Sequence, residues 1–406
     1  MKNLLFVSIA FPPKNDPECL QTAKYFKYLV RDPRLSISVV TSSLPTLNME
    51  YDAELEKYAH GYKQRVSLPI FETKVTNFAL RKILPGGIDY PDSKFSFHWQ
   101  AKRVIRKLQE KPDVIYSRSN PLSSALMACK LKQHYQVPWI MHLSDPWVGS
   151  PVHAYQGRQL SFHQKWQDAC MQQADAICLT SETTIEFYKK QYPRLAHKFQ
   201  FFPNVYDPDD VQANALKWEK KLRLVYAGGL SGERSPEFFI KACEELFAED
   251  QAVAEKFETI FAGPMDRMNK QRFEGATVPM VKHVGMMPFN KALELIREAH
   301  LLLTIDLPIL NPSLAMFFPS KILDYFLAKR RILALTTAGS ATERILKLRH
   351  ATILMYDNVE GIKHLIRQAI NEYENKNVEF FETSEIPVEF SARENATRLA
   401  NLICSY

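Results

Sequence analysis

The chain has 406 residues, a formal net charge of +7 and six cysteines scattered without a C-x-x-C pair. This length exceeds the size at which one hydrophobic core stops growing, so the sequence indicates two domains and argues against a disulfide framework or a zinc site. No apolar run approaches the ~20 residues of a membrane-spanning helix. The moderate positive charge is compatible with an anionic substrate, an anionic membrane surface or plain solubility, and we expect no nucleic acid as a partner.

The first half of the chain has the pattern of an α/β domain with a parallel sheet. Residues Leu4–Ala10 form a continuously apolar run that Pro12 and Pro13 end, which favours a buried first strand over a signal sequence. Residues Thr22–Leu29 follow with the spacing of an amphipathic helix. Further strands are predicted at Leu35–Thr41, Val114–Ser117, Trp139–Leu143 and Ala176–Thr180.

Ligands of such sheets bind beyond the carboxyl ends of the strands, where several polar residues of this chain are expected. We take Ser119 and Trp147 as candidate binding residues, and His142 and Asp145 as candidate catalytic residues. The ring of Trp147 would provide a floor for a sugar. A buried, hydrogen-bonded histidine is the alternative for His142, and a structural turn is the alternative for Asp145-Pro146-Trp147.

Residues 69–87 combine apolar and basic side chains. Phe71, Phe78 and Leu80 are interspersed with Lys74 and Arg81. Such a pattern suits peripheral contact with a membrane surface. The alternative is an ordinary helix that packs on its own domain with its charges in solvent.

A second α/β series begins after the turn-rich stretch 201–210. Asp207 and Asp209 in this stretch form a D-x-D pattern, which we interpret as turns and not as metal ligands. The strand Leu222–Ala227 runs through the loop 228–236 into a predicted helix at Glu237–Phe247, an order that suits phosphate binding. Candidate binding residues here are Gly228, Gly229, Arg234 and Gly263, and Arg234 is also a candidate catalytic residue. Further strands are predicted at Phe257–Ala262, Leu301–Ile305, Ile332–Leu335 and Ala351–Met355.

The stretch 317–327 predicts a loop that leads into a helix. Ser320 is placed to cap the helix, while Lys321 and Asp324 share one face near its positive N-terminal end. We expect Lys321, which is also a candidate catalytic residue, to bind the phosphates of a nucleotide diphosphate. Asp324 would accept hydrogen bonds from the ribose. The alternative is a capped surface helix with an ion pair.

These residues resemble the retaining nucleotide-sugar glycosyltransferases of family 4, which have the two-domain GT-B architecture. The most specific likeness is Pro319-Ser320-Lys321-Ile322-Leu323-Asp324-Tyr325, which is similar to the family's P-S-K-x-x-E-Y donor motif. The loop from Ala227 to Arg234 resembles its G-R-L-x-x-x-K phosphate loop. Ser144-Asp145-Pro146-Trp147 resembles a landmark of its acceptor domain.

The chain departs from the family pattern at several positions. Gly229 stands where many relatives have arginine, Arg234 replaces the usual lysine, and Asp324 replaces the second glutamate of the E-x(7)-E pattern. Met316 stands in place of the first glutamate. These departures leave the handling of the transferred sugar open.

The resemblance implies an α/β fold of two Rossmann-like domains facing across a cleft. Residues 1–203 would bind the acceptor and residues 204–388 the nucleotide sugar, while the final helix, within 389–406, would cross back to the first domain. The apolar face formed by Ala392, Ala396, Leu399 and Ile403 agrees with such a crossing.

The implied activity is transfer of a sugar from a nucleotide diphosphate donor to a glycan or lipid-linked acceptor, with retention of configuration and without metal or other cofactor. We expect a cytoplasmic protein, either free or at the inner face of the membrane. An epimerase of the same fold that acts on the donor alone and a catalytically degenerate binding subunit are the alternatives.

Overall fold

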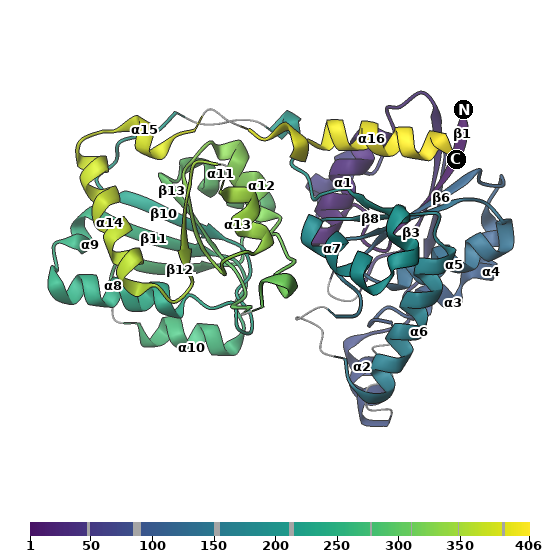
Figure 1. Cartoon of the computed structure of the whole chain (residues 1–406), viewed down its shortest axis with the longest axis horizontal. Helices are drawn as coiled ribbons and strands as arrows, with labels where there is room; N and C mark the ends of the chain where they lie inside the picture. The colour runs from purple at the N-terminus through teal and green to yellow at the C-terminus, as the bar shows by residue number, and fades with distance from the viewer. Residues whose placement is uncertain are drawn as a thin grey trace. The chain divides into compact units, whose positions relative to one another are not determined.

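The structure is a computed structural model that describes residues 1–46, 49–83, 91–149, 155–210, 215–276, 278–309, 311–347, 349–383 and 386–406. It divides into two compact units. Unit 1 comprises Met1–Asp207 and Val388–Tyr406, and unit 2 comprises Pro208–Pro387. Each unit is built on a parallel sheet with helices, which confirms the predicted fold class of two Rossmann-like domains (Figure 1).

Unit 1 contains a seven-stranded parallel sheet in the order β5-β3-β1-β6-β7-β8-β9. Its strands are β1 (Lys2–Val7), β3 (Leu35–Ser42), β5 (Gln64–Leu68), β6 (Val114–Ser119), β7 (Trp139–Leu143), β8 (Ala176–Leu179) and β9 (Phe199–Phe201). A small antiparallel pair joins β2 (Lys14–Asn15) to β4 (Glu50–Tyr51). The helices are α1 (Pro17–Leu29), α2 (Lys74–Ile83), α3 (Ser96–Trp99), α4 (Ala101–Lys107), α5 (Ser123–Tyr135), α6 (Gly157–Gln173), α7 (Glu182–Gln191) and α16 (Ala392–Ser405).

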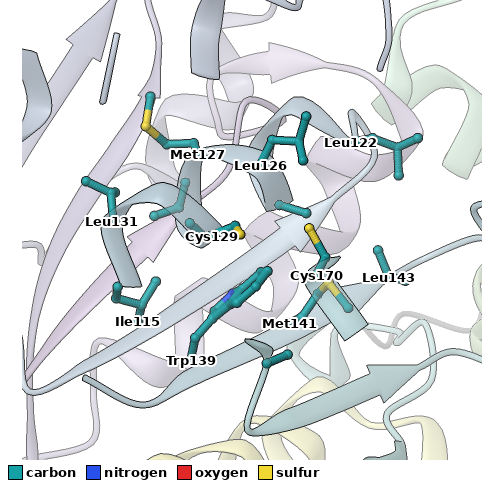
Figure 2. Close-up of a cluster of buried hydrophobic side chains, with 14 of the residues drawn as sticks. Ile115, Leu122, Leu126, Met127, Cys129, Leu131, Trp139, Met141, Leu143 and Cys170 are labelled. Atoms are coloured by element: carbon teal, nitrogen blue, oxygen red, sulfur yellow. The ribbon is translucent and has the colours of Figure 1, made fainter. Parts of the chain in front are cut away.

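On one face of this sheet, apolar side chains of β6 and β7 pack with those of α5 and α6 (Figure 2). Trp139 of β7 is fully buried in this cluster, and its indole nitrogen donates to the hydroxyl of Ser117 at 2.9 Å. Central strands that are apolar on both faces are expected in a parallel sheet that helices cover on both sides. The cluster therefore fixes the carboxyl ends of β6 and β7, where Ser119 and Asp145 lie.

The border between the compact units lies after Asp207, four residues beyond the predicted border after residue 203. Contacts with α1 hold this stretch on unit 1. The hydroxyl of Tyr25 donates to the carbonyl of Pro203 at 2.7 Å, and Tyr28 and Lys27 each donate to the carboxylate of Asp207 at 2.6 Å. Turn-forming residues at 203–210 indicate a junction without showing which side the side chains join.

The final helix α16 packs on α1, as the predicted crossing to the first domain required (Figure 1). Its apolar face, which includes Leu399 and Ile403, joins the core cluster that contains Leu4 and Phe6 of β1. The backbone of Ala392 also donates to the carbonyl of Tyr206, next to the end of the first segment of unit 1. The chain thus crosses from unit 1 to unit 2 and returns.

Unit 2 contains a six-stranded parallel sheet in the order β12-β11-β10-β13-β14-β15. Its strands are β10 (Leu222–Ala227), β11 (Phe257–Ala262), β12 (Val281–Gly285), β13 (Leu301–Ile305), β14 (Ile332–Thr336) and β15 (Ala351–Met355). The helices are α8 (Glu237–Glu249), α9 (Val253–Lys256), α10 (Arg267–Gly275), α11 (Phe289–Glu298), α12 (Lys321–Ala328), α13 (Ala341–Leu346), α14 (Val359–Glu374) and α15 (Val378–Phe381). Among the helices described in either unit, none has the length and apolar character needed to cross a bilayer.

Candidate functional site

Two loops of unit 2 meet at the carboxyl ends of β10 and β11, and both begin with glycine. Gly228 follows β10 and Gly263 follows β11, with φ angles of 145° and 136°. A Cβ atom on Gly263 would lie 2.2 Å from the carbonyl oxygen of Gly228, so only glycine allows this approach. Gly229 is different, because a Cβ atom there would have its nearest neighbour at 3.7 Å. Its backbone carbonyl accepts from Tyr226.

Helix α12 is fixed beside these loops by the tyrosine of its motif. The buried Tyr325 hydroxyl accepts from the backbone N–H of Ala227 and donates to the carbonyl of Leu303, both at 3.0 Å. These two bonds join α12 to β10 and β13, the two central strands of the sheet. The tyrosine therefore has a structural role, and it places the start of the helix beside the first glycine loop.

Lys321, the first residue of α12, directs its ammonium group toward Gly228. Its Nζ is buried without a hydrogen-bond partner and lies 3.4 Å from the ring centroid of Tyr226. A Cβ atom on Gly228 would come within 3.1 Å of this Nζ. Burial, and secondarily the charge of Arg234, lowers the pKa of Lys321 well below its usual range, while Asp306 opposes the shift.

Arg234 supplies a second cation to the same region. It lies in the loop that precedes α8 and lines a small pocket together with Asp306, Phe317 and Ser340. Its Nε is buried and has no hydrogen-bond partner. The structure thus brings together Gly228, Gly263, Arg234 and Lys321, which were predicted from separate stretches of sequence.

Ser320 and Asp324, the remaining candidate residues of the donor motif, lie at the start of α12. Ser320 occupies the N-cap position, but its backbone is helical and its side chain caps no amide group, so the predicted capping bond is absent. The preceding loop uses backbone bonds instead, since Ile322 donates to the carbonyl of Pro319 at 3.1 Å. Asp324 lies in the first turn of α12 and is half-buried. Its contact with ribose stays a prediction.

In unit 1, His142 is fully buried and hydrogen-bonded. Its Nδ1 is 2.7 Å from the hydroxyl of Tyr116, and its Nε2 is 3.2 Å from the carbonyl of Phe202. Burial, reinforced by the charge of Arg118, lowers its pKa well below the usual range and keeps the ring neutral. This geometry is that of the alternative, a buried and hydrogen-bonded histidine, and a catalytic role for His142 stays a prediction.

The other candidates of unit 1 lie around one pocket. A cavity of about 540 Å³ is lined by Asp16, Asp92, Lys94, Asn120, Trp147 and Gln159, among others. Asp145 accepts a hydrogen bond from Asn120 at 2.7 Å, next to this cavity. Trp147 lines the cavity, is almost completely buried and donates to His163, and its contact with a sugar stays a prediction. Ser119 is buried at the end of β6.

Sequence motifs did not single out Glu18, which lies close to this cavity. Its carboxylate accepts from the hydroxyl of Ser144 at 2.7 Å and is 2.8 Å from Nε of the buried Arg118. Burial raises the pKa of Glu18 to about 7, although Arg118 opposes the shift. Only the fold brings α1, β6 and the end of β7 together, so no local sequence signal identifies this cluster.

The D-x-D pattern has a structural explanation at its first residue. Asp207 is buried against Lys27 and Tyr28, and within the described residues no group of three or more histidine, cysteine or acidic side chains is arranged to hold a metal ion.

Comparisons with known proteins show what this chain is similar to in sequence and in fold. Residues 57–210 match the family model described as Glycosyltransferase Family 4. No curated protein sequence matches the chain. Among solved structures, the chain is similar to Anabaena HepE in complex with UDP-glucose, with a TM-score of 0.65, 12% identity and full coverage of both chains.

Two further structures show the same fold. A glycosyltransferase from Rickettsia africae has a TM-score of 0.64 and 8% identity, with 100% of this chain and 98% of that chain covered. A protein from Listeria monocytogenes described as a UDP-N-acetylglucosamine 2-epimerase has a TM-score of 0.60 and 11% identity, with coverages of 99% and 96%.

The chain therefore has the GT-B fold of these structures, and residues 57–210 carry the match to glycosyltransferase family 4. The resemblance to glycosyltransferase family 4 that the sequence motifs predicted is thereby confirmed.

Proposed function

We propose that the protein transfers a sugar from a nucleotide diphosphate donor, bound in unit 2, to a glycan or lipid-linked acceptor. The observation that carries this proposal is the pair of buried cationic atoms, Lys321 Nζ and Arg234 Nε, that have no hydrogen-bond partner. A buried charged atom without a hydrogen bond is costly, and a bound anion would supply the missing hydrogen bonds. A diphosphate would complete both.

The surroundings of the two cations favour an extended anion over a single small one. The glycine loops leave the backbone open to close approach, because Gly228 has no side chain beside Lys321. Arg234 lies in the loop that precedes α8, while Lys321 begins α12, so two separate helix starts carry one cation each. Helix N-termini and glycine loops are common phosphate-binding elements.

In the proposed reaction, these residues stabilise the departing nucleotide diphosphate. Negative charge grows on the leaving oxygen as the bond to the sugar breaks, and fixed cations in a water-poor site stabilise that charge. Asp324 would hold the ribose. Retention of configuration and independence from metal belong to this proposal on the strength of the family resemblance.

The acceptor would bind to unit 1, in the cavity that includes Asn120 and Gln159. Amide and carboxylate side chains around a cavity of about 540 Å³ suit the hydroxyl groups of a sugar. Asp145 stays a candidate for the catalytic role predicted for it. An epimerase would need no such acceptor, and the family match over residues 57–210, which includes this region, favours transfer.

The proposal is tested by the affinity of the purified protein for UDP and GDP, measured by calorimetry in buffer with EDTA. Replacing Lys321→Ala should weaken binding ~10–100-fold, because a hydrogen bond to a charged group contributes about 1.5–3 kcal/mol. Lys270→Ala is the matched control, since Lys270 lies in unit 2 on α10 and its side chain is 65% exposed. It should leave the affinity unchanged.

Unchanged affinity in Lys321→Ala, or no binding of either nucleotide to the wild type, would overturn the donor-site assignment. Binding that appears only when a divalent metal replaces EDTA would contradict the metal-free part of the proposal.

A further inference from the structure

Sequence motifs do not single out Asp306, a buried carboxylate of unit 2. It follows β13 directly, and only 9% of its surface is exposed. Its Oδ2 accepts from the hydroxyl of Thr336 at 2.6 Å, and that hydroxyl also bonds to Ser340 at 2.8 Å. Its Oδ1 has no hydrogen-bond partner. The hydroxyl of Thr342 lies beside the carboxylate, but it too lacks a well-formed bond.

The unpartnered oxygen belongs to the same region as the two unpartnered cations. Asp306 and Arg234 line one small pocket, and Phe317 forms part of its apolar wall. The charges of Arg234 and Lys321 both act on the Asp306 carboxyl group. Three charged side chains therefore surround one place in unit 2, and each has a buried polar atom without a hydrogen-bond partner.

The chemistry of a carboxylate limits what it can bind there. A carboxylate oxygen accepts hydrogen bonds and repels phosphate, so Asp306 cannot hold the diphosphate itself. A hydroxyl group satisfies it directly. A donor whose phosphates lie on Lys321 and Arg234 would bring its own hydroxyl-bearing sugar close to these cations.

We propose that Asp306 binds a hydroxyl group of the transferred sugar and so contributes to donor selection. This inference rests on the proposed function. In the resembled pattern the first glutamate is replaced here by Met316, which has no carboxylate. Asp306 would supply a carboxylate to the sugar instead. The ribose, which also carries hydroxyl groups, is the other source of the same chemistry, and the experiment separates the two.

The test compares a nucleotide sugar with its nucleoside diphosphate in the variant Asp306→Asn. The probes are UDP-glucose and UDP. If the wild type binds neither of these, GDP-mannose and GDP are used. The variant should bind the nucleotide sugar at least ~10-fold more weakly, as expected for loss of a hydrogen bond to a charged acceptor. Affinity for the diphosphate alone should be unchanged or tighter, because a negative charge near the phosphates is removed.

The retained affinity for the diphosphate also shows that the variant is folded. Glu274→Gln is the matched control, because it removes an exposed carboxylate from α10 of the same unit, outside the glycine loops. It should alter neither affinity. An equal loss for both probes in Asp306→Asn would assign the residue to the ribose or to the fold, and no loss for either would show that it contacts no donor. Either result overturns the inference, whereas failure of the Lys321→Ala test alone would overturn the donor site.

Discussion

Burial of the Lys321 ammonium group costs free energy, and an anion bound beside it would offset that cost. Its ammonium group is buried against the ring of Tyr226, with Arg234 nearby, and forms no hydrogen bond. The cation–π contact recovers part of the lost hydration. The remaining cost is consistent with a group held in place for an anion.

A consequence is that diphosphate binding should take up protons at alkaline pH. Burial and Arg234 lower the pKa of Lys321 in the free protein, so part of the population is neutral below the ordinary lysine value. A bound diphosphate favours the ammonium form and raises this pKa. Binding therefore takes up a proton, and affinity falls as pH rises between the free and bound pKa values.

Calorimetry in buffers of different ionisation enthalpy measures this uptake, at a pH well above the terminal phosphate pKa of about 6. Lys321→Arg is the matched control, because arginine stays charged throughout and should bind the diphosphate without proton uptake. Absence of uptake in the wild type, or equal uptake in Lys321→Arg, would contradict the assignment.

At the residue scale, sequence motifs could identify Lys321 and Arg234 but not Asp306 or Glu18. The first two lie in recognisable loop-to-helix segments with glycine or proline. The role inferred for Asp306 depends on its hydrogen bond with Thr336 and on the two nearby cations, and all three of these residues are distant from it in sequence. For His142 the sequence left a catalytic residue and a core histidine as alternatives, and its complete burial favours the core histidine.

At the scale of elements, strands with a continuous apolar run were predictable, and three strands at sheet edges were not. Five predicted strands match the structure residue for residue: Trp139–Leu143, Leu222–Ala227, Phe257–Ala262, Leu301–Ile305 and Ala351–Met355. The missed strands β5, β9 and β12 all lie at sheet edges. Lys282 and His283 of β12 are exposed, so that strand lacks the apolar run that marks a buried one.

The start of α1 was also placed too late in the sequence. Asp16 caps this helix by accepting from the backbone of Glu18, and Pro17 occupies the first helical position. An aspartate before a proline is a standard start signal that the apolar periodicity of Thr22–Leu29 does not include.

Helix α2 is the element on which the predicted membrane contact depends. Val75 and Phe78 of this helix are 76% and 64% exposed, and Phe71, which precedes the helix, is 61% exposed, so these apolar side chains do not pack on their own domain. The ammonium group of Lys82 lies 4.7 Å from the ring centroid of Phe78, so charge and apolar surface occur together. Residues 84–87 of the predicted segment lie outside the described residues.

We therefore expect the protein to cosediment with vesicles of phosphatidylglycerol and phosphatidylcholine, and less with phosphatidylcholine alone, because basic and apolar groups both contribute. The double variant Val75→Glu, Phe78→Glu should lose this binding. The control Val378→Glu, which changes an exposed valine of unit 2, should keep it. Vesicle binding that persists in the double variant, or is absent in the wild type, would contradict the predicted membrane contact of α2.

At the scale of the whole molecule, the chain forms one unit, then the other, and returns to the first. The return depends on α16, whose buried Leu399 and Ile403 complete a core begun by β1. The amphipathic pattern of 392–403 predicted a packed helix, but the choice of partner came from the family resemblance. The unit border needed the structure, because the contacts of Asp207 with α1 cannot be recognised from turn residues alone.

The central claim is that the donor binds unit 2 at its two loop-to-helix segments, and hydrogen exchange measured by mass spectrometry tests it most directly. The ligand is the nucleotide sugar that most raises the melting temperature in a thermal-shift screen. We predict that it slows amide exchange in peptides covering 228–234 and 319–324, and that Lys321→Ala at the same ligand concentration shows much less protection. Unchanged exchange in both segments at saturating ligand, with protection confined to unit 1, would contradict the account.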